Sequence, residues 1–256
     1  MIDLEKSKKE FEKYVDKYDS KNIKIKRKIN HSYRVVDVSE TIAKSLKISS
    51  EDVELAKLIG LLHDIGRFEQ IRIYNTFSDR DSIDHANLGV EILFKDNFIR
   101  KFIEENEYDE IIYKAIKNHN KYNIEEGLNK KELLHAKIIR DADKTDIYEI
   151  YLEDMKNNEN EIFNYDNLSK EIISDEVINY IEKNELVDRK YTKTNIDRYV
   201  SAIAFVFDYN FAKGLEIVKQ KQYIQKLINK IKTEENKEVM EKIENNINEY
   251  INKKIY

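Results

Sequence analysis

Cysteine and proline are absent from this chain of 256 residues, and glycine occurs only five times. Without cysteine the protein has no disulfide bond, no thiolate metal site and no cysteine nucleophile. Proline and glycine are the residues that most often form turns, and an all-β fold needs many turns. Their scarcity therefore favours an all-α protein.

Long apolar runs are also missing. No stretch approaches the roughly 18 consecutive apolar residues of a transmembrane helix, and the first residues lack the apolar core of a signal peptide. We therefore expect no membrane partner and a cytoplasmic location. The 45 basic and 50 acidic residues give a net charge of −5. This balance argues against a nucleic-acid partner, because phosphate-binding surfaces usually leave a net basic footprint.

Segments rich in Lys, Glu, Leu and Ile repeat their apolar residues with the period of an α-helix. The most continuously apolar segment runs from Val53 to His63, and we predict it to be the central buried helix. Further helices are predicted over residues 2–18, 30–46, 84–94, 108–119, 129–154, 169–183, 193–209, 220–231 and 235–255. The pattern predicts an all-α fold with additional helices in its C-terminal part.

Three stretches are predicted to be connections, namely residues 22–28, 68–84 and 157–167. The composition becomes acidic after Tyr151. We therefore predict one helical domain over residues 1–156 and a C-terminal helical extension over residues 157–256 that packs on it. Gly66 is predicted to turn the chain away from the central helix in a left-handed C-cap. Asp84 is predicted to cap the helix that follows it.

Four of the five histidines fall on apolar helix faces or at their ends, where a polar side chain is costly unless something compensates it. His31 lies one turn before Val35, and His63 ends the central helix. If these faces meet inside one bundle, they form a metal site with nitrogen and oxygen ligands. The residues concerned are His31, His63, Asp64, His85, His119 and Asp143. Six ligands exceed the need of one tetrahedral ion and suit two ions that share a carboxylate.

The order and spacing of these residues resemble the HD-domain superfamily of metal-dependent phosphohydrolases. The resemblance covers roughly residues 28–150 and implies a compact bundle of short helices. It implies that His31, His63, Asp64 and Asp143 hold one metal ion. It further implies that Asp64 bridges to a second ion, which His85 and His119 complete. The expected cofactors are one or two divalent transition metal ions, Fe or Mn first, with Mg, Ni and Zn as further options.

Within that superfamily the chain departs from the branch that cleaves cyclic di-GMP. Its Gly-Tyr-Pro signature cannot occur in a chain without proline, and His119 is followed by Asn120 where that branch has paired histidines. The pattern is more similar to the small two-metal branch that includes diadenosine tetraphosphate hydrolases. The same ligand set also occurs in di-iron oxygenases that resemble myo-inositol oxygenase.

The leading hypothesis is hydrolysis of a small phosphoester or phosphoanhydride, such as a nucleotide, by a metal-activated water. Arg67 and Lys144 are the candidate contacts for the substrate phosphate, beside Asp64 in the catalytic set. Two alternatives stay open, a di-iron oxygenase and a non-catalytic ligand-sensing module. His135 shares a helix stripe with Asp143, and we expect it to be a packed histidine rather than a ligand.

Overall fold

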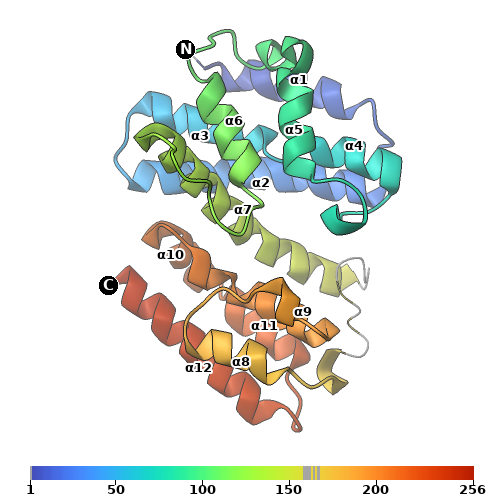
Figure 1. Cartoon of the computed structure of the whole chain (residues 1–256), viewed down its shortest axis with the longest axis vertical. Coiled ribbons are helices and arrows are strands. Elements are labelled where there is room, and N and C mark those ends of the chain that lie inside the picture. The colour runs from blue at the N-terminus through green and yellow to red at the C-terminus, as the bar shows by residue number, and fades with distance from the viewer. Residues whose placement is uncertain (1, 158–162, 164, 166–167) are drawn as a thin grey trace. The chain divides into compact units, whose positions relative to one another are not determined.

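The computed structural model describes every residue except 1, 158–162, 164 and 166–167. Throughout this part of the chain the regular structure is helical, with no strand (Figure 1). The prediction of an all-α bundle is therefore confirmed. The chain divides into two compact units, Met1–Asp146 and Ile147–Tyr256. The domain boundary after residue 156 and the packing of the extension stay predictions.

The first unit surrounds a nearly apolar helix, as predicted. Leu55, Leu58 and Leu61 of this helix have no solvent exposure, and it packs along α2. The helices of this unit are α1 (Leu4–Val15), α2 (Ile23–Ser45), the central α3 (Ser50–Leu62), α4 (Ile65–Tyr74), η1 (Asp79–Asp81), α5 (His85–Phe94), η2 (Lys95–Lys101), α6 (Asp109–Asn118) and the first part of α7 (Lys130–Asn157). None of the helices in the described residues is long and apolar enough to cross a membrane.

Two of the predicted connections are wrong in part. Residues 23–28 belong to α2, because the Asn22 side chain caps the helix by accepting from the Lys24 backbone N–H and Ile25 is buried against the core. Residues 68–74 belong to α4, whose Phe68 and Ile71 are buried. The first correction matters for the site, since it makes Lys28 and His31 neighbours on one helix face.

Gly66 does not form the predicted left-handed C-cap. It lies in the first turn of α4, and a Cβ atom there would come 2.2 Å from the carbonyl oxygen of His85 and 2.6 Å from the backbone nitrogen of Gly89. The missing side chain therefore lets α4 and α5 touch backbone to backbone. Asp84 caps α5 as predicted, because its carboxylate accepts from the Asn87 backbone N–H at 3.0 Å.

The second unit has a core of its own, in which Tyr148, Tyr199 and Leu227 are completely buried. The Tyr199 hydroxyl donates to the Leu227 carbonyl at 2.9 Å. The unit contains the end of α7, η3 (Leu168–Lys170), α8 (Asp175–Glu182), η4 (Arg189–Tyr191), α9 (Asn195–Ile203), η5 (Ala204–Asp208), α10 (Ala212–Gln220), α11 (Tyr223–Ile231) and α12 (Lys237–Ile255).

Here the predicted helices are only partly right. The helix predicted from residue 169 begins at Asp175, and the one predicted to residue 209 changes to the 3-10 turn η5 after Ile203. Helix α10 was not predicted. The predicted connection 157–167 lies mostly outside the described residues.

Candidate metal centre

The six residues singled out in the sequence come together in the first unit, although five different helices or helix ends supply them. His31 projects from α2, and the break between α3 and α4 supplies His63 and Asp64. His85 opens α5, His119 caps the end of α6, and Asp143 lies in α7. Three overlapping groups of these side chains have ligand atoms within 4.8 Å of one another, namely His31, His63 and Asp64; His63, His119 and Asp143; and Asp64, His85 and His119.

Asp64 lies between two pairs of histidines and turns one carboxylate oxygen toward each pair. Its Oδ2 is 3.3 Å from His31 Nε2 and 3.5 Å from His63 Nε2. Its Oδ1 is 3.3 Å from His85 Nε2 and 3.7 Å from His119 Nε2. Asp143 adds an oxygen to the first pair, 3.1 Å from His31 Nε2 and 3.6 Å from His63 Nε2. The geometry thus gives two groups of side chains that share Asp64.

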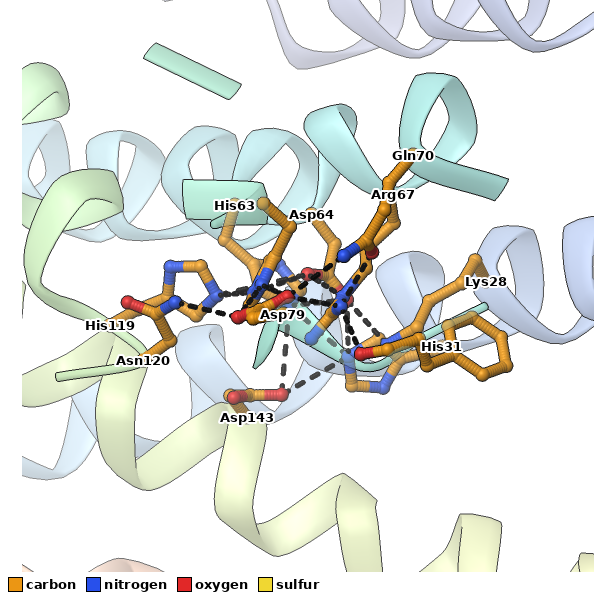
Figure 2. A network of polar contacts seen from close by, with 12 residues as sticks. Lys28, His31, His63, Asp64, Arg67, Gln70, Asp79, His119, Asn120 and Asp143 are labelled. Carbon is orange, nitrogen blue, oxygen red and sulfur yellow. Dashed lines mark hydrogen bonds and ion pairs between the residues drawn. The ribbon is translucent and has the colours of Figure 1, made fainter. Parts of the chain in front are cut away.

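We call His31, His63, Asp64 and Asp143 the first subsite, and Asp64, His85 and His119 the second subsite. Figure 2 shows Asp143 below the cluster and His119 at one side of it, with Lys28 approaching from the opposite side. The assignment of these residues as ligands stays a prediction.

The second nitrogen of each ring is fixed by an oxygen acceptor. His63 Nδ1 donates to the Gly60 carbonyl at 2.8 Å, and His119 Nδ1 donates to the Ile116 carbonyl at 2.6 Å. Carboxylates hold the other two rings: His31 Nδ1 lies 2.6 Å from Asp146, and His85 Nδ1 lies 2.7 Å from Asp79. In a neutral ring the proton then sits on Nδ1, and Nε2 carries a lone pair.

This arrangement fits divalent metal ions. The Nε2 atoms of His31 and His63 are 3.1 Å apart, and those of His85 and His119 are 2.9 Å apart. Lone pairs that face each other and carboxylate oxygens at such distances need a proton or a cation between them. Imidazole nitrogen and carboxylate oxygen are ligands that Zn, Mn and Fe accept, with the second ring nitrogen oriented by a hydrogen bond.

The ionisation of the cluster agrees with this donor set. Burial lowers the pKa of His63. Burial, together with the charge of Arg67, also lowers the pKa of His85 to about 3, although Asp79 opposes the shift. For Asp64 burial acts in the opposite direction, but Lys28 and the histidines hold its pKa well below the usual value.

His31 differs from these two histidines. Burial and Lys28 lower its pKa, but hydrogen bonds to Asp143, Asp146 and Asp64 outweigh them and raise it to about 10. In the metal-free protein His31 is therefore the ring that carries a second proton, which a metal ion would displace.

The comparison with known families agrees with this geometry. Residues 29–148 match the family model described as HD domain. This segment is an HD domain. No curated protein and no solved structure matches the chain. The matched segment contains the part of α2 that carries His31 and the part of α7 that carries Asp143.

Lys28, one residue before the matched segment, lies beside the cluster and was not singled out in the sequence analysis. Its ammonium nitrogen lies 2.6 Å from Asp64 Oδ2, and its side chain is 12% exposed. The same nitrogen lies 5.5 Å from the centre of the Phe77 ring. Its position three residues before His31 was a usable signal, because i and i+3 share a helix face. The sequence analysis missed Lys28 because it assigned residues 22–28 to a connection and not to a helix.

Arg67, predicted to contact phosphate, is engaged with the protein itself. Its Nη1 donates to Gln70 Oε1 at 2.6 Å, to the Phe77 carbonyl at 2.7 Å and to Asp79 Oδ1 at 2.8 Å. Its Nε has no hydrogen-bond partner among the described residues and lies 3.6 Å from Asp64 Oδ1. Lys144 is buried on α7 beside Asp143, and its role as a phosphate contact stays a prediction.

The fifth histidine stands apart from the cluster. His135 is buried on α7, and its Nε2 lies 3.3 Å from Asp52 Oδ1 at the start of α3. The HD domain therefore uses His135 to join α7 to α3, and the interpretation of this residue as a packed histidine agrees with its surroundings.

Proposed function

We propose that the HD domain of this chain is a metal-dependent phosphohydrolase for a small phosphoester or phosphoanhydride, such as a nucleotide. The observation that supports this most directly is the division of the Asp64 carboxylate between two histidine pairs. A carboxylate shared in this way can bridge a pair of adjacent divalent ions. We propose His31, His63, Asp64, His85, His119 and Asp143 as the ligands.

Two ions in these subsites, Fe or Mn in this proposal, would lower the pKa of a bound water and neutralise the oxygens of a phosphoryl group. The chain's own task is then to position the substrate and to add positive charge, which is the main requirement of phosphoryl transfer. Lys28 meets this requirement, because its ammonium lies beside Asp64 at the partly exposed edge of the cluster. Lys144 and Arg67, through Nε, are further proposed contacts for phosphate oxygens.

Asp146 and Asp79 support the reaction indirectly. Each accepts the Nδ1 proton of a proposed ligand, His31 or His85, and so keeps the Nε2 lone pair directed into the cluster. Neither carboxylate is required to move a proton in this proposal.

The test is a substrate screen with the full chain, purified without oxygen and loaded with Mn or Fe. Nucleotides, cyclic nucleotides, dinucleoside polyphosphates and sugar phosphates are each assayed for phosphate release or nucleotide products, with Asp64→Ala as the control. Strictly anaerobic hydrolysis that Asp64→Ala abolishes supports the proposal.

Three outcomes would replace the proposal. Oxygen consumption by the iron-loaded protein without hydrolysis of any phosphate compound would favour a di-iron oxygenase, which could use the same ligands. Hydrolysis that survives both His63→Ala and Asp64→Ala would mean that the reaction takes place elsewhere. Tight binding of a phosphorylated ligand with no turnover would favour a ligand-sensing module.

A further inference from the structure

The two carboxylates that orient metal-site histidines have very different surroundings. Asp146 lies on α7, one turn after Asp143, and its side chain is 4% exposed. It also pairs with Arg34, whose Nε lies 2.6 Å from its Oδ1. Asp79 instead opens the 3-10 turn η1 in the connection between α4 and α5, and its side chain is 27% exposed. The first subsite is thus supported by a long helix and the second by a connecting segment.

Asp79 accepts hydrogen bonds from four side chains at once. One is the ring of His85, and the second is Arg67 Nη1 at 2.8 Å. The amide of Gln70, which is completely buried, donates at 2.9 Å. Asn120 donates at 3.1 Å to Asp79 Oδ2. Because Asn120 directly follows His119, Asp79 is hydrogen-bonded both to His85 and to the residue next to His119.

Arg67 and Gln70 hold this segment from the side of α4. Arg67 Nη1 also binds the Phe77 carbonyl, and Gln70 Nε2 also contacts Ser82 Oγ at 2.9 Å and the Ile83 carbonyl at 2.9 Å. The two side chains therefore fix the connection on both sides of η1. Figure 2 shows Arg67 and Gln70 reaching from above toward Asp79.

We propose that Asp79 is the positioning residue of the second subsite and sets its metal affinity, and that Arg67 and Gln70 act on the metal through it. The inference rests on the proposed two-metal centre. Its physical basis is that a carboxylate on Nδ1 both fixes the ring and makes Nε2 a stronger ligand. Loss of such a partner typically lowers metal affinity by about 10- to 100-fold.

The experiment is anaerobic calorimetric titration of the metal-free full chain with Mn(II), combined with elemental analysis after gel filtration. Asp79→Asn is compared with its matched control, Asp146→Asn, which removes the corresponding charge from the first subsite. The wild type is expected to bind two ions. Asp79→Asn should bind one of them with unchanged affinity and the other about 10- to 100-fold more weakly.

Imidazole nitrogen spectra of the metal-free protein identify the subsite that is affected. Asp79→Asn should shift the ring signals of His85 and leave those of His63 in place, whereas Asp146→Asn should shift those of His31. A purely structural role of Asp79 would lower the melting temperature without this selectivity. Asn120→Ala is a milder change. It should lower the affinity for the same ion by several-fold, and it tests the inference if Asp79→Asn does not fold.

The outcomes separate this inference from the proposed function. Two ions in the wild type and unchanged affinities in both Asp79→Asn and Asn120→Ala would overturn the role of Asp79 alone. The role of Asp79 would also be overturned if Asp79→Asn lowered the affinity for both ions equally, or if the wild type bound only one ion. A wild type that binds no divalent ion would remove the proposed two-metal centre together with the inference.

Discussion

His31 Nε2 and His63 Nε2 face each other at 3.1 Å, while the other ring nitrogen of each is held by Asp146 or by the Gly60 carbonyl. Neither ring can turn away without losing a buried hydrogen bond, which costs about 1–3 kcal/mol. In the metal-free protein the second proton of His31 lies between these two nitrogens, and a bound metal ion would take its place.

Metal ions are accordingly expected to stabilise the chain. Mn(II) or Fe(II) at roughly 100 times its dissociation constant should add about 2.7 kcal/mol to the free energy of unfolding, and a chelator should reverse the gain. Thermal or urea unfolding of the full chain measures this. His135→Gln, which lies outside the cluster, should keep the metal-dependent gain, and Asp64→Ala should lose most of it. A wild type with identical unfolding curves with and without Mn, Fe and Zn would contradict the prediction.

Replacement of Lys28 should impair turnover more than metal binding. Lys28→Met keeps much of the side-chain bulk but removes the ammonium 2.6 Å from Asp64, so kcat/KM for a phosphorylated substrate should fall by about 10- to 100-fold, equivalent to about 1.4–2.7 kcal/mol. Metal affinity should stay equal or rise, because a competing cation is gone. Lys26→Met, on the exposed face of the same helix, is the matched control. An unchanged kcat/KM for Lys28→Met would exclude a role for this ammonium in substrate binding.

At the contact between α4 and α5, alanine should be tolerated at Gly89 but not at Gly66. Gly66→Ala brings a methyl group to 2.2 Å from the His85 carbonyl oxygen, so α4 and α5 must separate. We expect a loss of about 1–3 kcal/mol in the free energy of unfolding and weaker binding of one metal ion, since His85 moves. Gly89→Ala is the control, because its nearest new contact is at 3.4 Å. Equal stability of the two variants would show that the close approach does not constrain the helices.

Acid should destabilise the junction between α3 and α7. Burial lowers the pKa of His135, although Asp52 opposes the shift. Burial raises the pKa of Asp52, but hydrogen bonds from Ser49, Lys131 and His135 lower it overall. The folded chain therefore binds fewer protons than the unfolded chain at both residues. Stability from His135 should fall as the pH drops below its unfolded pKa of about 6.5, and stability from Asp52 below about 3.8.

The measurement for this pair is the free energy of unfolding in urea between pH 7.5 and 5. His135→Gln cannot take up the proton, so its stability should depend less steeply on pH than that of the wild type. Since both proteins keep the other four histidines, the difference between their curves isolates His135. Parallel curves would be evidence against a depressed pKa at this residue.

In the second unit, Asp197 is expected to be the most sensitive polar residue at the start of α9. Its carboxylate accepts from the backbone and hydroxyl of Ser174 at 2.8 and 2.7 Å and from the backbone N–H groups of Lys193 and Thr194 at 2.9 and 3.0 Å. Asp197→Ala should cost on the order of 2 kcal/mol or more, because four partly buried donors lose their acceptor. Asp188→Ala, which caps only the short turn η4, should cost well under that. Chemical unfolding of both variants tests the difference.

The sequence by itself determined the helical class, the central helix and the set of six polar residues, because all three depend on periodicity along a single helix. The same periodicity could have identified the residues one helical turn from a proposed ligand, namely Lys28 beside His31 and Asp146 beside Asp143. Connections were less predictable. Residues 23–28 and 68–74 are helical because buried side chains such as Ile25 and Phe68 stabilise turns that the local pattern leaves ambiguous.

Only the tertiary structure decided how the six residues divide and what supports them. The split of Asp64 between two histidine pairs depends on where five helices or helix ends meet, which no local period encodes. The role of Gly66 depends on α5 passing within contact of its backbone, 19 residues away in sequence at His85. Arg67 was predicted to bind phosphate, yet its Nη1 reaches Asp79 because a folded connection brings that carboxylate to it. Such long-range contacts are set by packing, and the sequence specifies them only through the whole fold.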